Sequence, residues 1–209
     1  MRVDSSAPPT AADLSPTEFI DSDDETVREF AARAAGDASD EHDTIARLFA
    51  AVRDGIRYDP YSVSGESADY RASNVLASDS GYCVQKSVAL TAAARAAGIP
   101  SRLGFADVKN HLQSEKLREA MGTDLFVWHG YSTFYAGGRW TKASSAFNRE
   151  LCERFGVAPL DFDGREDALL HPFTGDGSKY MEYVHDRGVY RDLPLKEMLE
   201  SFRETYGGA

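Results

Sequence analysis

Two cysteines and five histidines are the residues of this 209-residue chain best suited to covalent chemistry. Cys83 follows a Ser-Gly turn and opens an alanine-rich segment with the composition of a helix. The first turn of a helix carries unpaired N–H groups and the positive end of the dipole, so we expect a thiolate to be favoured there. The same N–H groups could stabilise an oxyanion on a substrate. Cys83 is therefore a candidate nucleophile, and the alternative is a small buried residue.

The second cysteine, Cys152, falls within a predicted helix beside apolar neighbours, which is typical of a packed thiol. The N-terminal segment has neither an apolar stretch nor a small-residue cleavage site of the kind that marks a secretory signal. We therefore expect a cytoplasmic protein in which both thiols are free.

A cysteine nucleophile requires a base, and the surroundings favour His129 among the histidines. His129 lies within the apolar run 126–131, where an unpaired ring would cost free energy and needs a partner. The other four lie in acidic, polar or turn-rich surroundings: His42, His111, His171 and His185. A lone strand histidine is more often a hydrogen-bonded core residue than a catalyst. The hypothesis therefore depends on the joint occurrence of His129 with Cys83.

A predicted hairpin supplies a third candidate residue. Two runs rich in aromatic and β-branched residues flank Gly137-Gly138, which suits a two-residue turn. The register of that turn places Ser144 on the same face as His129, about 7 to 8 Å away between Cα atoms and within reach of a side-chain hydrogen bond. A group in this place could fix the imidazole tautomer. With a loop one residue longer, Ser145 would take the place instead.

The elements that must position these residues follow from hydrophobic periodicity and from turn residues. Helical spacing or composition predicts helices over 27–34, 45–52, 84–97, 114–121, 148–155 and 196–206, with a single helical turn at 74–77. Alternating or β-branched runs predict strands over 102–108, 125–135 and 139–144. The chain shows no internal repeat and no long linker. This order predicts an α+β domain in which helices precede an antiparallel sheet.

Composition and charge limit the kind of protein and its partners. The hydrophobic fraction of 42% suits one soluble domain, and apolar runs such as 88–94 are too short to cross a bilayer, so a transmembrane enzyme is excluded. The net charge of −11 repels phosphate backbones and anionic membrane surfaces, so we expect neither nucleic acid nor membrane as a partner. Prolines and acidic residues near the start predict a flexible arm over 1–14, followed by a single domain over 15–209.

The order of these motifs resembles the transglutaminase-like superfamily of cysteine hydrolases. Gly81-Tyr82-Cys83 opens an alanine-rich helix that ends in the stretch 95–102, and His129-Gly130 and Trp140 follow. The segment 52–59 resembles the lead-in to that core, and the resemblance spans about residues 45–148, with 149–209 as a C-terminal extension. It implies a papain-like fold, with the nucleophile-bearing helix packed on an antiparallel sheet beside N-terminal helices. It also implies that Cys83 is the nucleophile and His129 the base.

The sequence departs from the family pattern at one position. The family usually has an aspartate on the strand after the histidine, four residues beyond a tryptophan, and the residue four beyond Trp140 is Ser144. A serine can orient an imidazole but cannot stabilise imidazolium as a carboxylate does. Three alternatives stay open: weaker catalysis with Ser144, replacement by Asn148 or by an acid from elsewhere, or loss of turnover.

These features together predict a Cys/His hydrolase or acyl transferase that acts on an amide or peptide-type bond, with an atypical third member. The rival prediction is a binding module that retains the cleft without the chemistry. No cofactor is required, and the sequence shows neither metal-ligand spacing nor a phosphate-binding loop. The acidic stretch 161–167 has its glycine misplaced for calcium binding, so we expect a solvated turn there. We expect a peptide or small amide as substrate, and hydrolysis rather than crosslinking, since crosslinking usually requires additional domains.

Overall fold

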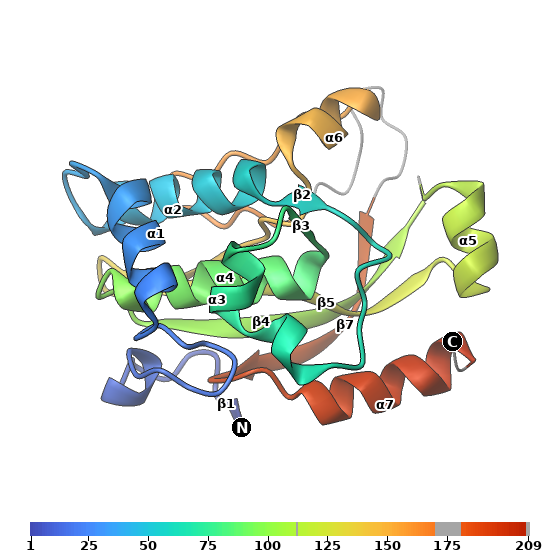
Figure 1. Ribbon diagram of the computed structural model, residues 1–209, viewed down its shortest axis with the longest axis horizontal. Coiled ribbons are helices and arrows are strands. Elements are labelled where there is room, and N and C mark those ends of the chain that lie inside the picture. Colours follow the sequence, from blue (N-terminus) through green and yellow to red (C-terminus); the bar gives the residue numbers. More distant parts are fainter. Residues whose placement is uncertain (112, 170–180, 208–209) are drawn as a thin grey trace.

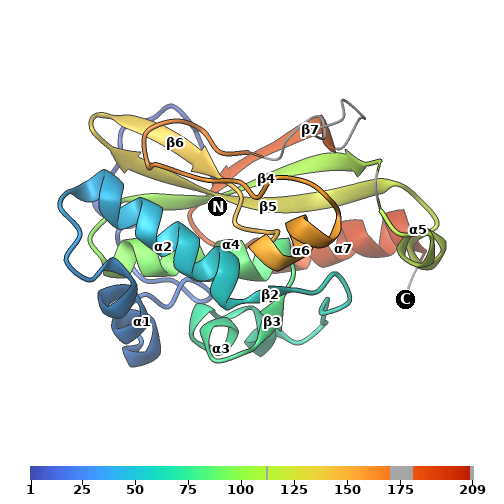
Figure 2. The same ribbon diagram turned by 90° about the horizontal axis from the view of Figure 1, so that it is seen from above.

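The computed structural model describes residues 1–111, 113–169 and 181–207, and in this part of the chain helices cover one face of an antiparallel sheet (Figures 1 and 2). The helices are α1 (Glu25–Ala35), α2 (Glu41–Gly55), α3 (Ala72–Leu76), α4 (Cys83–Ala96), α5 (Glu115–Met121), α6 (Arg149–Arg154) and α7 (Leu195–Tyr206). Short 3₁₀ turns span Ala11–Asp13 and Ser67–Tyr70. None of the helices described is both long enough and apolar enough to cross a membrane.

One sheet of five strands carries the site. Its strands are β1 (Arg2–Val3), β4 (Ser101–Asn110), β5 (Leu125–Ala136), β6 (Arg139–Ala143) and β7 (Met181–Tyr190). Their order is β1-β7-β4-β5-β6, and all neighbours are antiparallel. A separate parallel pair joins β2 (Arg57–Tyr58) to β3 (Ser80–Gly81). The predicted α+β class with an antiparallel sheet is confirmed.

The β5–β6 hairpin has the predicted register. Ala136 lies opposite Arg139, so the turn consists of two glycines. Gly137 and Gly138 have φ values of 58° and 84°, which glycine adopts without the steric cost that a side chain would bring. Two positive φ values are typical of the type I′ turn, whose twist matches the twist of the two strands in a two-residue hairpin. The turn chemistry therefore sets which residues of β5 and β6 share a face.

Helix α4 forms the centre of the molecule. Every residue of α4 from Cys83 to Arg95 is buried, and the helix contacts β5 on one side and α1, α2 and α3 on others. Its many alanines permit this close approach because they leave no side chain beyond Cβ. On the sheet, Gly130 serves the same purpose, since a Cβ there would lie 3.0 Å from Val84 Cα. The sequence thus brings the first turn of α4 directly against β5.

Strand β7 was not predicted from the sequence. This strand lies between β1 and β4, whereas we predicted turn-rich surroundings for His185, and that prediction is wrong. The alternation typical of a strand is broken because the β4–β7 register shifts twice, on either side of Asp107. Gly188 and several charged residues further obscure the pattern.

The first 14 residues lie against the sheet, whereas the sequence predicts a flexible arm there. β1 pairs with β7, and Asp13 is fully buried. The Asp13 carboxylate accepts hydrogen bonds from Arg102 Nε at 2.9 Å and from Arg191 Nε at 3.0 Å. Although burial acts in the opposite direction, the hydrogen bonds from Arg102, the Thr10 N–H and Arg191 hold the pKa of Asp13 far below its usual range. The carboxylate of Asp13 in the N-terminal segment therefore pairs with two arginines, one in β4 and one directly after β7.

We expect Asp13→Asn to lower the free energy of unfolding by about 2 kcal/mol, because Arg102 would keep its buried position without a negative partner. Since the pKa of Asp13 is depressed in the folded state, its contribution is present above about pH 4 and is lost as the pH falls further. Chemical denaturation of the wild type and of Asp13→Asn at several pH values measures the difference in the free energy of unfolding. The exposed Asp23→Asn is the control, and an equal effect of the two substitutions would contradict the prediction.

Candidate active site

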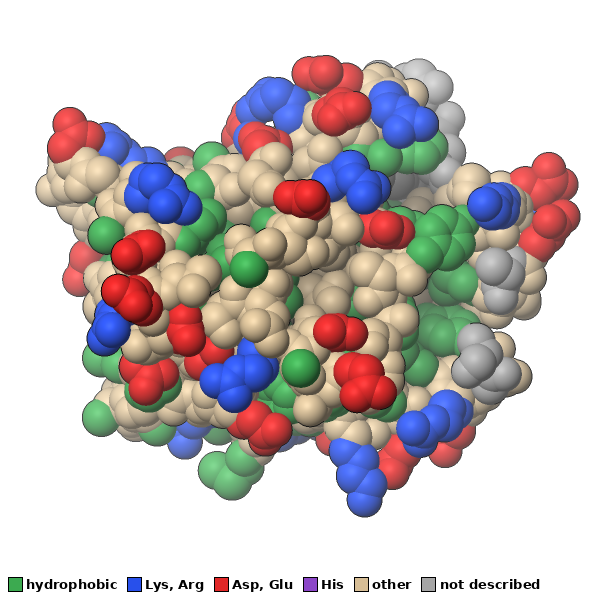
Figure 3. Space-filling model, viewed as in Figure 1, with side chains coloured by type: hydrophobic (Ala, Val, Ile, Leu, Met, Phe, Trp, Pro, Cys, Tyr) green, Lys and Arg blue, Asp and Glu red, His purple; other side chains and the backbone are tan. Residues whose placement is uncertain are grey.

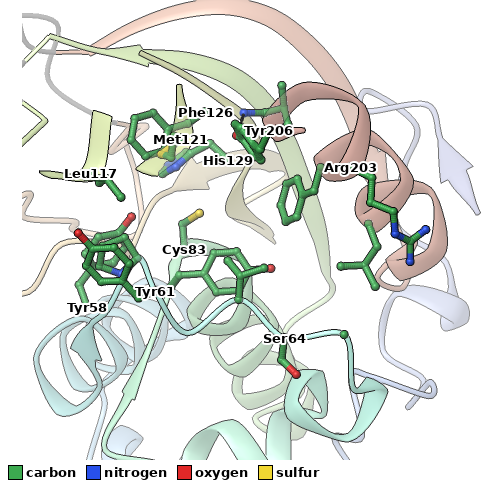
Figure 4. Close-up of a pocket in the computed structure, with 17 residues that line it drawn as sticks. Tyr58, Tyr61, Ser64, Cys83, Leu117, Met121, Phe126, His129, Arg203 and Tyr206 are labelled. Carbon is green, nitrogen blue, oxygen red and sulfur yellow. Dashed lines mark hydrogen bonds between the residues drawn. The ribbon is translucent and has the colours of Figure 1, made fainter. Parts of the chain in front are cut away.

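Cys83 and His129 line the same apolar cavity, which has a volume of about 540 Å³ (Figure 4). Its walls come from segments that are far apart in the sequence: the loop 58–65, the start of α4, helix α5, the start of β5 and helix α7. In the close-up the Cys83 side chain extends toward the end of the cavity that holds His129. The fold therefore brings the predicted nucleophile and the predicted base to one place.

Cys83 is a buried thiol surrounded by backbone donors. Its exposed fraction is 8%, and this burial raises the pKa of the Cys83 thiol to about 11. Hydrogen bonds from the N–H groups of Gly130, Val84 and Cys83 itself act in the opposite direction but are outweighed. The thiolate that we expected at this helix start is thus disfavoured, because the loss of hydration destabilises it more than the N–H groups of the helix N-terminus stabilise it.

This burial predicts the pH dependence of alkylation. Since the pKa of Cys83 is raised to about 11, the reactive thiolate is scarce at pH 7, and its fraction grows about tenfold per pH unit up to that value. We expect the rate of Cys83 labelling by limiting iodoacetamide to rise in this way from pH 7 to pH 10. Mass spectrometry of the cysteine peptides gives the rates. Fast labelling that levels off below pH 8 would instead show that the helix N-terminus prevails.

His129 is buried and hydrogen-bonded to Ser144, as the hairpin register predicts. Nε2 of His129 lies 3.2 Å from Oγ of Ser144, and the two residues are 3% and 2% exposed. Burial lowers the pKa of His129 to about 4, so the ring is neutral near pH 7. The hydroxyl of Ser145 is buried too, and it has no hydrogen-bond partner in the part of the chain that the structure describes. Ser144, and not Ser145, is therefore the residue hydrogen-bonded to the imidazole.

Asn148, an alternative to Ser144 as the residue that orients His129, contacts the backbone of another segment instead. Its Oδ1 accepts a hydrogen bond from the backbone N–H of Tyr58 at 3.1 Å. This bond ties the start of α6 to the loop that forms one wall of the cavity. The structure thus gives Asn148 a role in holding the wall, while Ser144 contacts the imidazole.

A β-bulge immediately before His129 sets the path of the chain. Two residues of β5, Val127 and Trp128, oppose the single residue Asp107 of β4. Trp128 has φ 60°, which is the one positive value among the described residues other than glycine. The bulge frees two N–H groups from the ladder: that of Val127 donates to Tyr206 Oη at 2.8 Å, and that of Trp128 donates to Asp107 Oδ1 at 3.0 Å. Side chains from two other elements therefore fix the backbone that carries His129.

The remaining histidines lie in other surroundings. His42 is half-buried, and its Nδ1 lies 2.9 Å from the carbonyl oxygen of Gly164. His111 and His185 are exposed, and Nε2 of His111 lies 3.3 Å from a carboxylate oxygen of Glu182. His171 lies outside the described residues.

Both cysteines are free, as predicted, and Cys152 is a packed residue. It is 4% exposed in the small core between α6 and the sheet, and its thiol lies 4.0 Å from the Phe147 carbonyl oxygen. We expect Cys152→Ser to lower the free energy of unfolding by about 1 to 3 kcal/mol, because it places a hydroxyl in an apolar site. Denaturation curves measure the loss. Cys152→Ala, which keeps the site apolar, is the comparison, and an unchanged stability in Cys152→Ser would contradict the prediction.

Helix α7 and Lys86 take a part in forming the site that was not predicted from the sequence. Phe202 and Tyr206 of α7 reach the cavity, and their spacing of one helical turn is the signal that could have indicated a shared face. Lys86 is fully buried and donates to the carbonyl oxygens of Arg53 at 2.9 Å and Ile56 at 2.6 Å. Burial lowers the pKa of Lys86 to about 7. This lysine holds the chain that leads from α2 toward the cavity wall.

The acidic stretch that we predicted to be a solvated turn forms one. Asp163 Oδ1 accepts hydrogen bonds from the N–H groups of Arg165 at 2.8 Å and Glu166 at 3.0 Å. Among the residues described, no group of three or more His, Cys, Asp or Glu side chains could hold a metal ion.

Comparison with known proteins gives a family and a fold. Residues 28–144 match the model of the transglutaminase-like superfamily, and no curated protein matches the chain. Among solved structures the chain is similar to a putative cysteine protease from Cytophaga hutchinsonii, with a TM-score of 0.52 and 16% identity over 87% of this chain and 47% of that one. It is also similar to a putative protease from Parabacteroides distasonis ATCC 8503, with a TM-score of 0.44 and 17% identity over 65% of this chain and 26% of that one. The chain thus spans less than half the length of either structure.

Proposed function

Because the chain belongs to the transglutaminase-like superfamily, we propose that it is a cysteine-dependent hydrolase or acyl transferase that acts on an amide or peptide-type bond. One observation carries the proposal: Cys83 and His129 line one cavity, and the imidazole is hydrogen-bonded to Ser144 at 3.2 Å. A nucleophile, a base and a group that orients the base are the elements such chemistry requires.

The reaction begins with a neutral pair, since burial raises the pKa of Cys83 and lowers that of His129. His129 takes the thiol proton as the sulfur attacks the carbonyl carbon, and the carbonyl oxygen becomes an oxyanion. The N–H groups at the start of α4, including that of Cys83, receive this charge. Because Ser144 contacts Nε2, Nδ1 is the ring nitrogen that exchanges the proton with the thiol.

The tetrahedral intermediate collapses when His129 returns the proton to the leaving nitrogen, which departs as an amine and leaves a thioester on Cys83. Water or an amine then attacks the thioester, with His129 again accepting and returning one proton. Water gives a free acid, and an amine gives a new amide. Ser144 holds the ring but brings no negative charge to the imidazolium that forms in both steps.

A screen of peptide and amide substrates in H₂¹⁸O tests this function. Hydrolysis places one ¹⁸O atom in the acid product, whereas acyl transfer to an added amine forms a new amide without it. We expect one of these products with the wild type and neither with Cys83→Ala. Turnover that survives in Cys83→Ala would overturn the proposal.

A second function, a binding module that retains the cleft, is favoured by one observation. The group beside the imidazole is the uncharged Ser144, and the thiol is protonated at rest because burial raises the pKa of Cys83. Binding of an amide to the wild type, without product in the same screen, would support this alternative.

A further inference from the structure

Among the residues that the structure describes, few charged side chains line the cavity above Cys83. Of the 17 described residues that line it, Arg203 is the one lysine, arginine or carboxylate side chain. The chain as a whole contains 34 acidic residues, so the exclusion of carboxylates from this lining does not follow from composition. On the face shown in Figure 3, charged groups of both signs are spread over the surface, and hydrophobic side chains show in the hollow between α5 and α7.

Arg203 belongs to the rim of the cavity. The residue is exposed, and its guanidinium points away from Cys83 (Figure 4). Arg203 also lines a neighbouring surface depression together with charged residues of the same helix, Lys196, Glu197 and Glu200. The part of the cavity next to the thiol is therefore formed by aromatic and aliphatic groups and by hydroxyls.

A substrate group that reaches the thiol must lose its water. Cys83 and His129 are 8% and 3% exposed, and the walls around them include Phe126, Leu117 and Met121. A carboxylate or ammonium group placed there would lose its hydration without gaining an opposite charge, which is strongly unfavourable. An apolar group of the same size would instead gain free energy from burial against these walls.

Resting on the proposed function, we infer that the acyl part of the substrate beside the scissile amide is an uncharged aromatic or aliphatic group. A volume of about 540 Å³ accommodates roughly one or two bulky side chains. The cavity therefore discriminates against acidic and basic acyl groups.

Four fluorogenic substrates test this class directly. They are the 7-amido-4-methylcoumarin derivatives of N-acetyl-phenylalanine, N-acetyl-leucine, N-acetyl-lysine and N-acetyl-glutamate. We expect kcat/KM for the first two to exceed that for the last two by about 100-fold or more, because the charged side chains would be left without partners. A charged substrate that is turned over as fast as the apolar ones would overturn the inference.

Opposite charges introduced at Met121 sharpen the test. Met121 is a half-buried cavity residue at the end of α5, so a charged side chain introduced there keeps part of its hydration. Met121→Lys should raise kcat/KM for the glutamate substrate and Met121→Glu that for the lysine substrate, each by about tenfold or more relative to the neutral control Met121→Gln. Equal responses of the two charged variants to both substrates would contradict this assignment of the wall.

Binding to Cys83→Ala separates the substrate class from the chemistry. We expect N-acetyl-phenylalanine amide to bind this variant at least about tenfold more tightly than the lysine and glutamate amides, as followed by NMR titration. Equal or tighter binding of a charged amide would overturn the inference. Apolar preference in this titration, with no turnover of any substrate by the wild type, would instead remove the proposed catalysis and leave the ligand class intact.

Discussion

Replacing Cys83 by serine should reduce kcat/KM by at least about 10⁴-fold, because the nucleophile of a Cys/His pair cannot be replaced by a far less acidic hydroxyl. A serine hydroxyl is far less acidic than a thiol, so proton transfer to His129, whose pKa burial lowers to about 4, becomes still less favourable. The measurement is turnover of the best substrate found in the screen, with thermal unfolding followed on the same preparation.

The structure also predicts a small effect of Cys83→Ser on stability. Although residue 83 is buried, the N–H groups of Gly130 and Val84 favour a polar or charged side chain there, since they act to lower the pKa of the Cys83 thiol. We therefore expect the free energy of unfolding to change by less than about 1 kcal/mol. Cys152→Ser is the matched control, since it should lose stability and keep activity. The reverse result, with activity lost in a fully folded Cys152→Ser, would move the nucleophile to the other cysteine.

The sequence predicted the parts of the site that depend on local rules. A glycine pair fixes a two-residue turn, and the period of two along a strand then places Ser144 beside His129. Likewise, an alanine-rich segment that begins at Cys83 and ends before Gly98 and Pro100 gives the boundaries of α4 within one residue. These features need no knowledge of distant contacts.

The features that the sequence did not predict depend on long-range contacts. Burial raises the pKa of Cys83 to about 11 and outweighs the neighbouring N–H groups, and the cavity that Cys83 lines is formed in part by the loop 58–65 and α7. Strand β7 was missed because its bulges break the alternation, and its place between β1 and β4 comes from chain distant in sequence. Tyr206 reaches the bulge before His129 from the last helix described. Hydrophobic periodicity is a local property, so it does not predict contacts between residues that are distant in sequence.

Among single substitutions that should increase the reactivity of the site, we expect the largest effect from Ser144→Asp. A carboxylate beside Nε2 would favour the charged imidazole, so the pKa of His129 should rise from about 4 toward or above its ordinary value. A protonated His129 in turn stabilises the thiolate of Cys83. At neutral pH we therefore expect iodoacetamide to label Cys83 about 100-fold faster than in the wild type.

The pH profile of kcat/KM gives an independent reading of the same substitution. With the pKa of His129 near 4 in the wild type, the ring is a base at all higher pH values, and the rate limb that it causes lies at acidic pH. In Ser144→Asp this limb should move upward, and in Ser144→Ala it should stay while kcat falls by a modest factor. Ser145→Asp is the matched control, because among the described residues the Ser145 hydroxyl has no hydrogen-bond partner and so does not hydrogen-bond to the imidazole. A limb that moves in Ser145→Asp and stays in Ser144→Asp would mean that residue 144 does not orient the base, and the third member would have to be sought outside the hairpin.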